Sequence, residues 1–380
     1  MMVRDVALAL SGGGYRAAYF HLGVLQKLHE LDLLSRVAVI SSVSGGSIIA
    51  GSYAQSLVNG GSFATFLSRT QEFLCKKTLD WPTLVAEVIQ QSSGSLEGQL
   101  VPLFTRPGGA LTRLSDLKES AWPRFLFNAT LVHSGRGWRF VSGGTAEEWE
   151  LGQTHAAAYS RIVDCYRCDV TLAKAVAASA AYPLFSSVTI DRSLISEPPP
   201  AEPRNFPDLP DPVCLSDGGV MDNTGLTSII AGHEPPGWEK DYYLIGSDAG
   251  SIVNPLDHPP KGRIRKVHYL LRQFEITGHH NNRMTVALIL KVHRTQLKSK
   301  KGMAMLRFDE AVPERREVSK AVADLVGVKT RLKFPGSDLA HGLMEHGANL
   351  LWARVSEYTD LLPEDREMPA IQKRSHRDEN

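Results

Sequence analysis

Short apolar runs, each closed by a turn rich in glycine and serine, stand out in the first part of the chain. Residues 6–10 and 37–40 are two such runs, and each turn is followed by a longer helix-like segment. A short apolar run bounded by turn residues is typical of a buried strand. The pattern therefore predicts a strand, a turn and a helix over residues 6–34 and again over residues 37–58. Further strands are predicted at residues 125–132, 138–141 and 242–247.

Helical and irregular segments are predicted between and after these strands. Residues 172–181 contain six alanines and favour a helix that packs closely against its neighbours. Residues 74–114 favour helices and loops that partly cover a site. Residues 197–212 contain seven prolines, so we expect a long irregular loop that acts as a lid. Helices and a basic hairpin-like stretch are expected after residue 250.

The order of strands and helices indicates the fold class. It predicts an α/β fold, a three-layer α/β/α sandwich with a mostly parallel central sheet. We expect a single domain over residues 1–362, with the motifs in residues 6–250 and a C-terminal extension over residues 251–362. Residues 363–380 mix both signs of charge without apolar periodicity, so we expect a flexible tail there.

The second turn, S-V-S-G-G-S at residues 42–47, is typical of a nucleophile elbow. A tight strand-to-helix turn exposes the residue at its tip and requires small residues two positions before and after it. Ser44 has Ser42 and Gly46 at those positions, whereas every other serine of this turn would have a bulky residue at one of them. The spacing therefore selects Ser44. The alternative is a serine that caps a helix after a buried strand.

The first turn, S-G-G-G-Y-R-A at residues 11–17, offers backbone donors. Gly12, Gly14 and Ala17 also fit the dinucleotide fingerprint G-x-G-x-x-G/A, but that interpretation requires an acidic residue at the end of the second strand, which ends in two serines. No Gly-Lys-Ser/Thr follows, so a P-loop is excluded. The remaining use of this glycine turn is the binding of an anion by free N–H groups at a helix N-terminus. In acyl transfer, that anion is the tetrahedral oxyanion.

A serine nucleophile also needs a base, and Asp217 is the candidate. Gly218 and Gly219 follow it, so its carboxylate can sit on an open stretch of backbone. A lone Asp-Gly pair is usually only a turn. The nearby alanine-rich helix favours the functional interpretation, because its small side chains allow close packing.

Four blocks in this order resemble the patatin-like phospholipase family, which is related to the catalytic domain of cytosolic phospholipase A2. They are G-G-G-Y-R-A at 12–17, S-V-S-G-G at 42–46, A-A-S-A-A-Y-P at 177–183 and D-G-G-V at 217–220. The resemblance implies a patatin-like fold and a Ser–Asp dyad without histidine, in which Ser44 is the nucleophile and Asp217 its base.

The resemblance implies further roles around this dyad. It assigns the oxyanion hole to the N–H groups of Gly12, Gly13, Gly14 and Gly45. Arg16 matches the family's arginine, which supports the loop or meets the substrate phosphate; the alternative is an exposed arginine at a helix N-terminus. The chain departs from the usual elbow at Ser42, which replaces its first glycine, and this departure puts the geometry of the elbow in question.

The alternative hydrolase is the Ser-Asp-His triad of the α/β-hydrolase fold. The chain has 13 histidines, several of them after Asp217: His233, His258, His268, His279 and His280. In that fold the elbow follows a later strand, whereas here it follows the second predicted strand. We therefore favour the dyad and expect most of these histidines to lie at the surface or to cap helices.

Composition and charge restrict the partners. The net charge of +1 gives no signature of binding to a nucleic acid polymer. No run approaches the roughly 20 apolar residues of a membrane span, and residues 1–5 lack a signal-peptide pattern. We expect a cytoplasmic protein that meets a phospholipid membrane transiently.

Two local features remain. Residues 261–301 carry 11 Lys or Arg against one acid, Glu275, which suits an anionic phospholipid or a small-molecule activator; the alternative is a solvated face. Cys165 and Cys168 form half of a possible zinc site, but no second pair exists, so we expect reduced thiols and no metal.

The predicted function is a lipid acyl hydrolase of the phospholipase A type. It would cleave fatty-acyl esters of phospholipids through an acyl-serine intermediate, and the chemistry requires no cofactor. Two alternatives stay open. One is a ligand-gated lipase effector whose basic region binds a signalling nucleotide or a partner, and the other is a catalytically dead lipid-binding protein.

Overall fold

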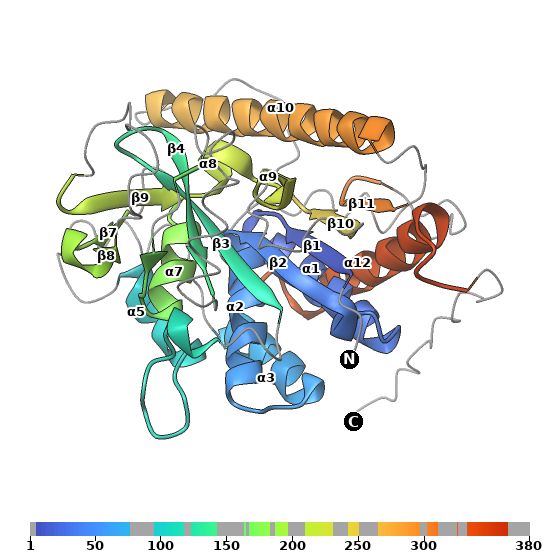
Figure 1. Ribbon diagram of the computed structural model, residues 1–380, viewed down its shortest axis with the longest axis horizontal. Coiled ribbons are helices and arrows are strands. Elements are labelled where there is room, and N and C mark those ends of the chain that lie inside the picture. The colour runs from blue at the N-terminus through green and yellow to red at the C-terminus, as the bar shows by residue number, and fades with distance from the viewer. Residues whose placement is uncertain are drawn as a thin grey trace.

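A central sheet lies between two layers of helices in the computed structural model of the chain (Figure 1). The structure describes residues 5–76, 95–117, 123–142, 163–164, 167–182, 187–196, 210–230, 242–250, 265–296, 302–310, 325 and 333–363. The three-layer α/β/α sandwich predicted from the sequence is confirmed.

The main part of the sheet is parallel. Its strands lie in the order β11-β10-β1-β2-β3, and each pair of neighbours is parallel. Their bounds are β1 Val6–Leu10, β2 Val37–Val43, β3 Arg124–Leu131, β10 Tyr243–Asp248 and β11 Met303–Arg307. The carboxyl ends of parallel strands meet at one edge of a sheet, so the turns after β1, β2 and β10 gather there.

Antiparallel pairings extend the sheet beyond β3. Strand β4 is antiparallel to β3 and parallel to β5, while β9 is antiparallel to both β3 and β7. The bounds are β4 Arg136–Val141, β5 Val163–Asp164, β7 Val188–Ile190 and β9 Val213–Asp217. A separate two-stranded sheet pairs β6 (Arg167–Cys168) with β8 (Ile195–Ser196).

Strands β2 and β9 share one side of β3 and approach each other from opposite directions. Strand β2 pairs with the first part of β3 and ends with Val43 opposite Asn128. Strand β9 pairs with the last part of β3 and ends with Asp217 opposite Ala129. The final residue of β9 therefore comes next to Ser44, the residue that follows β2.

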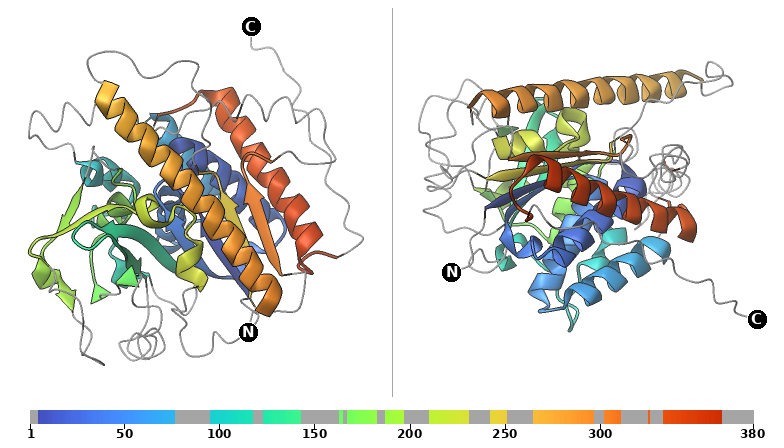
Figure 2. Two further views of the ribbon diagram at one scale, coloured as in Figure 1. Left: turned by 90° about the horizontal axis from the view of Figure 1, so that it is seen from above. Right: turned by 90° about the vertical axis from the view of Figure 1, so that its right-hand side faces the viewer.

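Helices cover both faces of the sheet (Figures 1 and 2). One face carries α1 (Gly14–Glu30), α2 (Gly45–Val58), α7 (Leu172–Ser179) and α12 (Ser337–Tyr358), with α3 (Phe63–Lys76) and α5 (Leu96–Leu100) packed outside them. The other face carries α8 (Gly219–Asp222), α9 (Leu226–Ile230) and α10 (Arg265–Gln296). Short 3-10 turns occur at Leu34–Arg36, Val101–Leu103, Leu114–Asp116 and Arg192–Leu194.

The uninterrupted apolar character of β1 follows from burial on both faces. Val6, Leu8 and Leu10 point into the larger core, on the side of α1 and α12. Ala7 and Ala9 point into a smaller core under α10. All five side chains are fully buried, which is the usual state of a central parallel strand.

Helix α12 packs against α1 at very short range. A Cβ on Gly23 of α1 would lie 1.9 Å from the carbonyl oxygen of Met344, and a Cβ on Gly347 of α12 would lie 2.2 Å from that of Phe20. Glycine at both positions therefore allows the two backbones to touch. The helix that follows the first glycine turn is held in place by a helix from the end of the chain.

The structure refines several of the predicted elements. The alanine-rich helix ends at Ser179, two residues earlier than predicted. Most of the basic region is one helix of 32 residues, α10, and not a hairpin, because Val286 and Ile289 recur with helical spacing and bury one side against the smaller core. No helix that the structure describes combines the length and apolar character needed to cross a membrane.

Other predictions fall outside the described residues. They include residues 77–94 of the partial cover, residues 197–209 of the proline-rich loop, the tail from residue 364, and Cys165. Cys168 is described, and its thiol is free and buried. Among the described residues, no group of three His, Cys, Asp or Glu side chains could hold a metal ion.

Candidate active site

Ser44 lies at the tip of the turn between β2 and α2. Its backbone has φ 50° and ψ −116°, and only one other described non-glycine residue, Asp32, has a positive φ. Such a conformation costs an L-residue free energy and persists only where the surroundings enforce it. The enforcement is visible at Gly46, where a Cβ would lie 2.5 Å from the carbonyl oxygen of Leu10. The small residue two positions after Ser44 is therefore required.

Ser42 accounts for the missing first glycine of the elbow. Its side chain is fully buried. The Ser42 hydroxyl donates to the carbonyl oxygen of Leu126 at 3.2 Å and accepts a hydrogen bond from the Ser47 hydroxyl at 3.0 Å. A hydroxymethyl group therefore fits two residues before Ser44, because both of its hydrogen-bonding functions are satisfied.

Asp217 lies at the end of β9 with only 4% of its surface exposed. Its carboxylate accepts a hydrogen bond from the N–H of Gly219 at 2.7 Å and another from the Ser44 side chain. Burial raises the pKa of Asp217 to about 6, and the two hydrogen bonds oppose part of that rise. The carboxylate is thus ionised at neutral pH, yet it is a stronger proton acceptor than an exposed aspartate.

The end of α7 holds both turns. The carbonyl oxygen of Ser179 accepts hydrogen bonds from the N–H groups of Ser44 and Gly218, each at 3.2 Å. The carbonyl oxygen of Ala181 accepts one from the N–H of Asp217 at 2.7 Å. One short segment therefore fixes the separation between Ser44 and Asp217, and its small side chains allow that approach.

The glycine turn presents N–H groups beside Ser44. Within the described part of the chain, the N–H groups of Gly13, Gly14 and Gly45 have no hydrogen-bond acceptor. The N–H of Gly12 differs, because it donates to the carbonyl oxygen of Asn223 at 2.9 Å. The two turns touch, since a Cβ on Gly45 would lie 2.2 Å from the carbonyl oxygen of Gly14. N–H groups without an acceptor in the described part of the chain therefore lie close together at two helix N-termini.

Arg16 points toward the loop after β10 and is almost fully buried. Its guanidinium donates to the carbonyl oxygens of Ala249 at 3.1 Å and Gly250 at 2.5 Å, and it lies 5.0 Å from the centre of the Phe308 ring. Burial lowers the pKa of Arg16 to about 10, so it stays charged at neutral pH. Arg16 is therefore not an exposed arginine at a helix N-terminus, and the loop that it contacts is the one after β10.

Two contributors to this geometry were not assigned from the sequence. Ser179 belongs to the alanine-rich block, but nothing in the letters shows that its carbonyl oxygen joins the two turns. Asn223 fixes Gly12 through its backbone, and its side-chain oxygen lies where a Cβ on Gly12 would be, at 2.1 Å. The only available signal was its position six residues after Asp217.

Histidines play no visible part in this geometry. Among the described residues, no hydrogen bond to the side chain of Ser44 or Asp217 comes from a histidine. His21 is fully buried between the Ser247 hydroxyl and the Ser11 carbonyl oxygen, and burial lowers its pKa to about 4. His279 and His280 lie on α10, and His233 and His258 lie outside the described residues.

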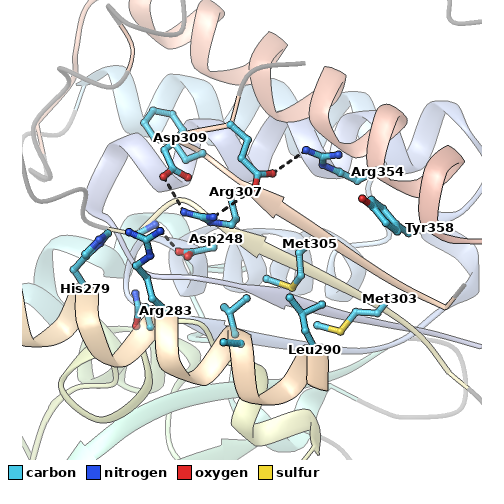
Figure 3. Close-up of a pocket in the computed structure, with 16 residues that line it drawn as sticks. Asp248, His279, Arg283, Leu290, Met303, Met305, Arg307, Asp309, Arg354 and Tyr358 are labelled. Atoms are coloured by element: carbon cyan, nitrogen blue, oxygen red, sulfur yellow. Dashed lines mark hydrogen bonds and ion pairs between the residues drawn. The ribbon is translucent and has the colours of Figure 1, made fainter. Parts of the chain in front are cut away.

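A cavity of about 370 Å³ lies near this site, between α10, the ends of β10 and β11, and α12 (Figure 3). Its charged groups largely pair with one another: Arg307 lies 2.9 Å from Asp309, and Arg354 lies 3.0 Å from Glu310. Gly250 is part of its lining, and Arg16 binds the same residue. The cavity is thus a neighbour of the glycine turn along the same edge of the sheet.

Comparison with protein families identifies the chain. The sequence model of the family named patatin-like phospholipase matches residues 8–230, more than half of the chain and including all four motif blocks. The chain belongs to the patatin-like phospholipase family, a family of lipid hydrolases. A comparison with curated proteins gave no match.

Solved structures show a distant likeness. Human group IVD cytosolic phospholipase A2 is 12% identical, with a TM-score of 0.48; the match covers 93% of this chain and 61% of that one. VipD from Legionella pneumophila is 12% identical, with a TM-score of 0.42 and coverage of 93% and 67%. ExoU from Pseudomonas aeruginosa, in complex with SpcU, is 13% identical, with a TM-score of 0.31 and coverage of 92% and 53%. The chain spans about half to two thirds of these proteins, and the family assignment rests on the sequence match.

Proposed function

We propose that the protein is a lipid acyl hydrolase of the phospholipase A type, in which Ser44 and Asp217 form a catalytic dyad. The observation that carries this proposal is the hydrogen bond between the Ser44 side chain and the buried carboxylate of Asp217. An alcohol attacks an ester poorly unless a base takes its proton. A buried carboxylate with a pKa of about 6 suits that role near neutral pH.

In the proposed reaction, the oxygen of Ser44 attacks the carbonyl carbon of the fatty-acyl ester. Asp217 takes the hydroxyl proton and passes it to the leaving alcohol of the lysophospholipid. The free N–H groups of Gly13, Gly14 and Gly45 stabilise the tetrahedral oxyanion; in related sites, the loss of one such donor costs on the order of 10²–10³-fold in rate. The N–H of Gly12 donates to the carbonyl oxygen of Asn223 and is not one of these donors. Gly12 contributes to the oxyanion hole only because it has no side chain and leaves space there.

The second half of the reaction releases the fatty acid. Water attacks the acyl-serine, and Asp217 acts as base toward that water. The tetrahedral intermediate then collapses, and Ser44 regains its proton from Asp217. Every step uses groups of this chain and water. A phospholipid substrate brings the protein to a membrane surface.

The direct test incubates the purified protein with vesicles of phosphatidylcholine and phosphatidylglycerol, followed by mass spectrometry of the lipids. We expect fatty acid and lysophospholipid from the wild type and neither from Ser44→Ala. Intact lipid, combined with normal labelling of Ser44 by a fluorophosphonate, would point to the ligand-gated alternative. Intact lipid without any labelling would overturn the proposed chemistry.

A further inference from the structure

Helix α10 lies across the outside of the molecule (Figures 1 and 2). One side of the helix packs on the sheet, where Asn282, Val286 and Ile289 are buried. These residues explain how α10 is held. The opposite side faces away from the sheet.

That opposite side carries three large apolar residues among exposed polar ones, which include Gln273, Thr277 and Asn281. Leu270, Met284 and Leu288 are exposed to 49%, 59% and 62%. At about 100° per residue they lie within roughly 40° of one another around the helix. Exposed Lys266 and Lys291 fall in the same sector, near the two ends of the helix. We refer to these five residues as the outer face of α10.

The charge of the helix is strongly one-sided. Its six basic residues stand against a single acid, Glu275. The basic residues are Arg265, Lys266, Arg272, Arg283, Lys291 and Arg294. A second copy of the chain would bring these positive charges against one another, so charge favours an anionic partner over self-association.

The shape of the outer face suits a flat partner. Its apolar residues lie between Leu270 and Leu288, 18 helical steps apart, which at 1.5 Å per step is about 27 Å. A specific protein interface normally buries a compact patch of about 800 Å² per partner. Large apolar side chains beside Lys on one face of a helix are instead typical of helices that lie in a membrane interface.

The helix also lies beside the candidate active site. It packs against α8, the turn that follows Asp217. Burial is the main reason that the pKa of Tyr182 rises to about 12, and the charges of Glu275 on α10 and of Asp217 add to it. Tyr182 is therefore close to both carboxylates, so α10 lies near the end of β9 that carries Asp217.

We propose that the outer face of α10 docks the protein on membranes that contain anionic phospholipid. Leu270, Met284 and Leu288 enter the boundary between head groups and acyl chains, and Lys266 and Lys291 bind the anionic head groups. This inference rests on the proposed function for its biological sense, because docking brings ester bonds to Ser44. It requires no hydrolysis and is testable without it.

The test measures co-sedimentation with phosphatidylcholine vesicles, with and without phosphatidylglycerol, in a Ser44→Ala background that cannot consume the lipid. The double change Met284→Asp and Leu288→Asp should weaken binding to anionic vesicles at least tenfold. The matched control is Val132→Asp with Leu194→Asp, two exposed apolar residues away from α10 (55% and 46% exposed). The control should bind like its parent.

Salt gives a second readout. The parent should lose most of its preference for anionic vesicles at high ionic strength, because charges at a surface are screened over about 8 Å at physiological salt and over less above it. The apolar variants on the wild-type background should keep hydrolysis of a short soluble ester, which confirms that they fold. A loss of soluble-ester hydrolysis with vesicle binding intact would overturn the proposal.

Other outcomes separate docking from chemistry. Unchanged vesicle binding by the α10 variant would overturn the docking proposal and leave the dyad untouched. Vesicle binding that depends on α10, in a protein whose wild type hydrolyses no ester, would support docking and contradict the proposed function. Light scattering that shows the α10 variant breaking an oligomer, with vesicle binding unchanged, would make the outer face a protein interface and overturn the membrane assignment.

Discussion

Ser44 combines a strained backbone with a hydroxyl that has one specific acceptor. The backbone has φ 50° and ψ −116°, and the hydroxyl forms a hydrogen bond with Asp217 and makes no capping hydrogen bond to the helix that follows. Residues in sparsely populated conformations persist where the surrounding structure over-determines them. Here the surroundings are the Ser179 backbone and hydroxyl, which both accept from the N–H of Ser44.

The nucleophile is testable by chemical labelling. Ser44→Ala should abolish labelling by a fluorophosphonate and ester hydrolysis while leaving the thermal midpoint close to that of the wild type. Ser42→Ala and Ser47→Ala should keep labelling, since their hydroxyls only support the turn, and each should cost about 1 kcal/mol of stability. Labelling of Ser44→Ala at the wild-type rate would show that another residue is the nucleophile.

The base is testable through pH. Activity should rise as pH increases through about 6, where Asp217 loses its proton, because only the carboxylate can accept the Ser44 proton. Asp217→Asn should lose activity on the order of 10³–10⁴-fold across the pH range. A histidine variant that stops acylation altogether would favour the triad instead.

Asp222 provides the control for that substitution. Its carboxylate accepts hydrogen bonds from the N–H and hydroxyl groups of both Thr224 and Thr227. Asp222→Asn would turn an amide N–H toward two of these donors, so it should lower stability by about 1–3 kcal/mol. Its effect on the rate should be much milder than that of Asp217→Asn.

Stability should change with pH in the opposite sense to activity. The folded pKa of Asp217 is about 6, above its ordinary value of 3.8, so between these values the folded protein holds more protons than the unfolded chain. The contribution of Asp217 to the free energy of unfolding is therefore fully present below pH 3.8. It is lost as pH rises through 6, and the total change is about 3 kcal/mol. The difference in unfolding free energy between wild type and Asp217→Asn, measured by denaturant titration, should show this slope. A difference that is flat across the window would contradict the raised pKa.

At the scale of elements, the contact between the two turns is the critical one. Gly45→Ala would place a Cβ 2.2 Å from the Gly14 carbonyl oxygen, so the turns must separate and the oxyanion donors move apart. We expect a loss of about 10²-fold or more in kcat for a soluble ester, with labelling of Ser44 slowed in proportion. Gly278→Ala on α10 is the matched control, since a Cβ there meets nothing within 4 Å. Equal rates for the two variants would exclude the proposed hole.

Strands and turns were predictable from the sequence where a few neighbouring residues determine them. The runs that became β1 and β2, and the turns after them, were read correctly because steric rules and apolar periodicity act over a few residues. The resemblance supplied the pairing of Ser44 with Asp217. No pattern in the letters shows that β9 runs against β2 along the same side of β3, because strand pairing across the chain depends on tertiary packing. The same limit hid the Ser179 carbonyl.

At the scale of the whole molecule, the C-terminal extension is tied to the site. Strand β11 of the extension pairs with β10 and continues the sheet that carries Ser44, and α12 packs on α1 through Gly23 and Gly347. We therefore propose that residues up to 362 fold as one unit. Thermal unfolding followed by tryptophan fluorescence and by loss of ester hydrolysis should give one coincident transition. Two separate transitions would make the extension a domain of its own.

Gly347→Val tests the same coupling with a single change. Its side chain would meet the Phe20 backbone, so α12 must shift away from α1 at a cost of about 1–3 kcal/mol. Because α1 begins at the glycine turn, activity should fall together with stability. Gly342→Ala, whose Cβ would meet only the tip of the Leu325 side chain at 3.3 Å, should keep both. Full activity in a destabilised Gly347→Val would show that α12 does not position the turn.

The meeting of β2 and β9 has a consequence for how the protein is made. Synthesis proceeds from the N-terminus, so the segment with Ser44 leaves the ribosome well before the segment with Asp217. Contacts between distant parts of a chain form late, since closing a long loop costs entropy before it is rewarded. With the dyad proposed above, a nascent chain carries Ser44 without Asp217, and lipid hydrolysis waits until β9 has been made and paired. Membranes near the ribosome therefore meet an active hydrolase only after β9 has paired with β3.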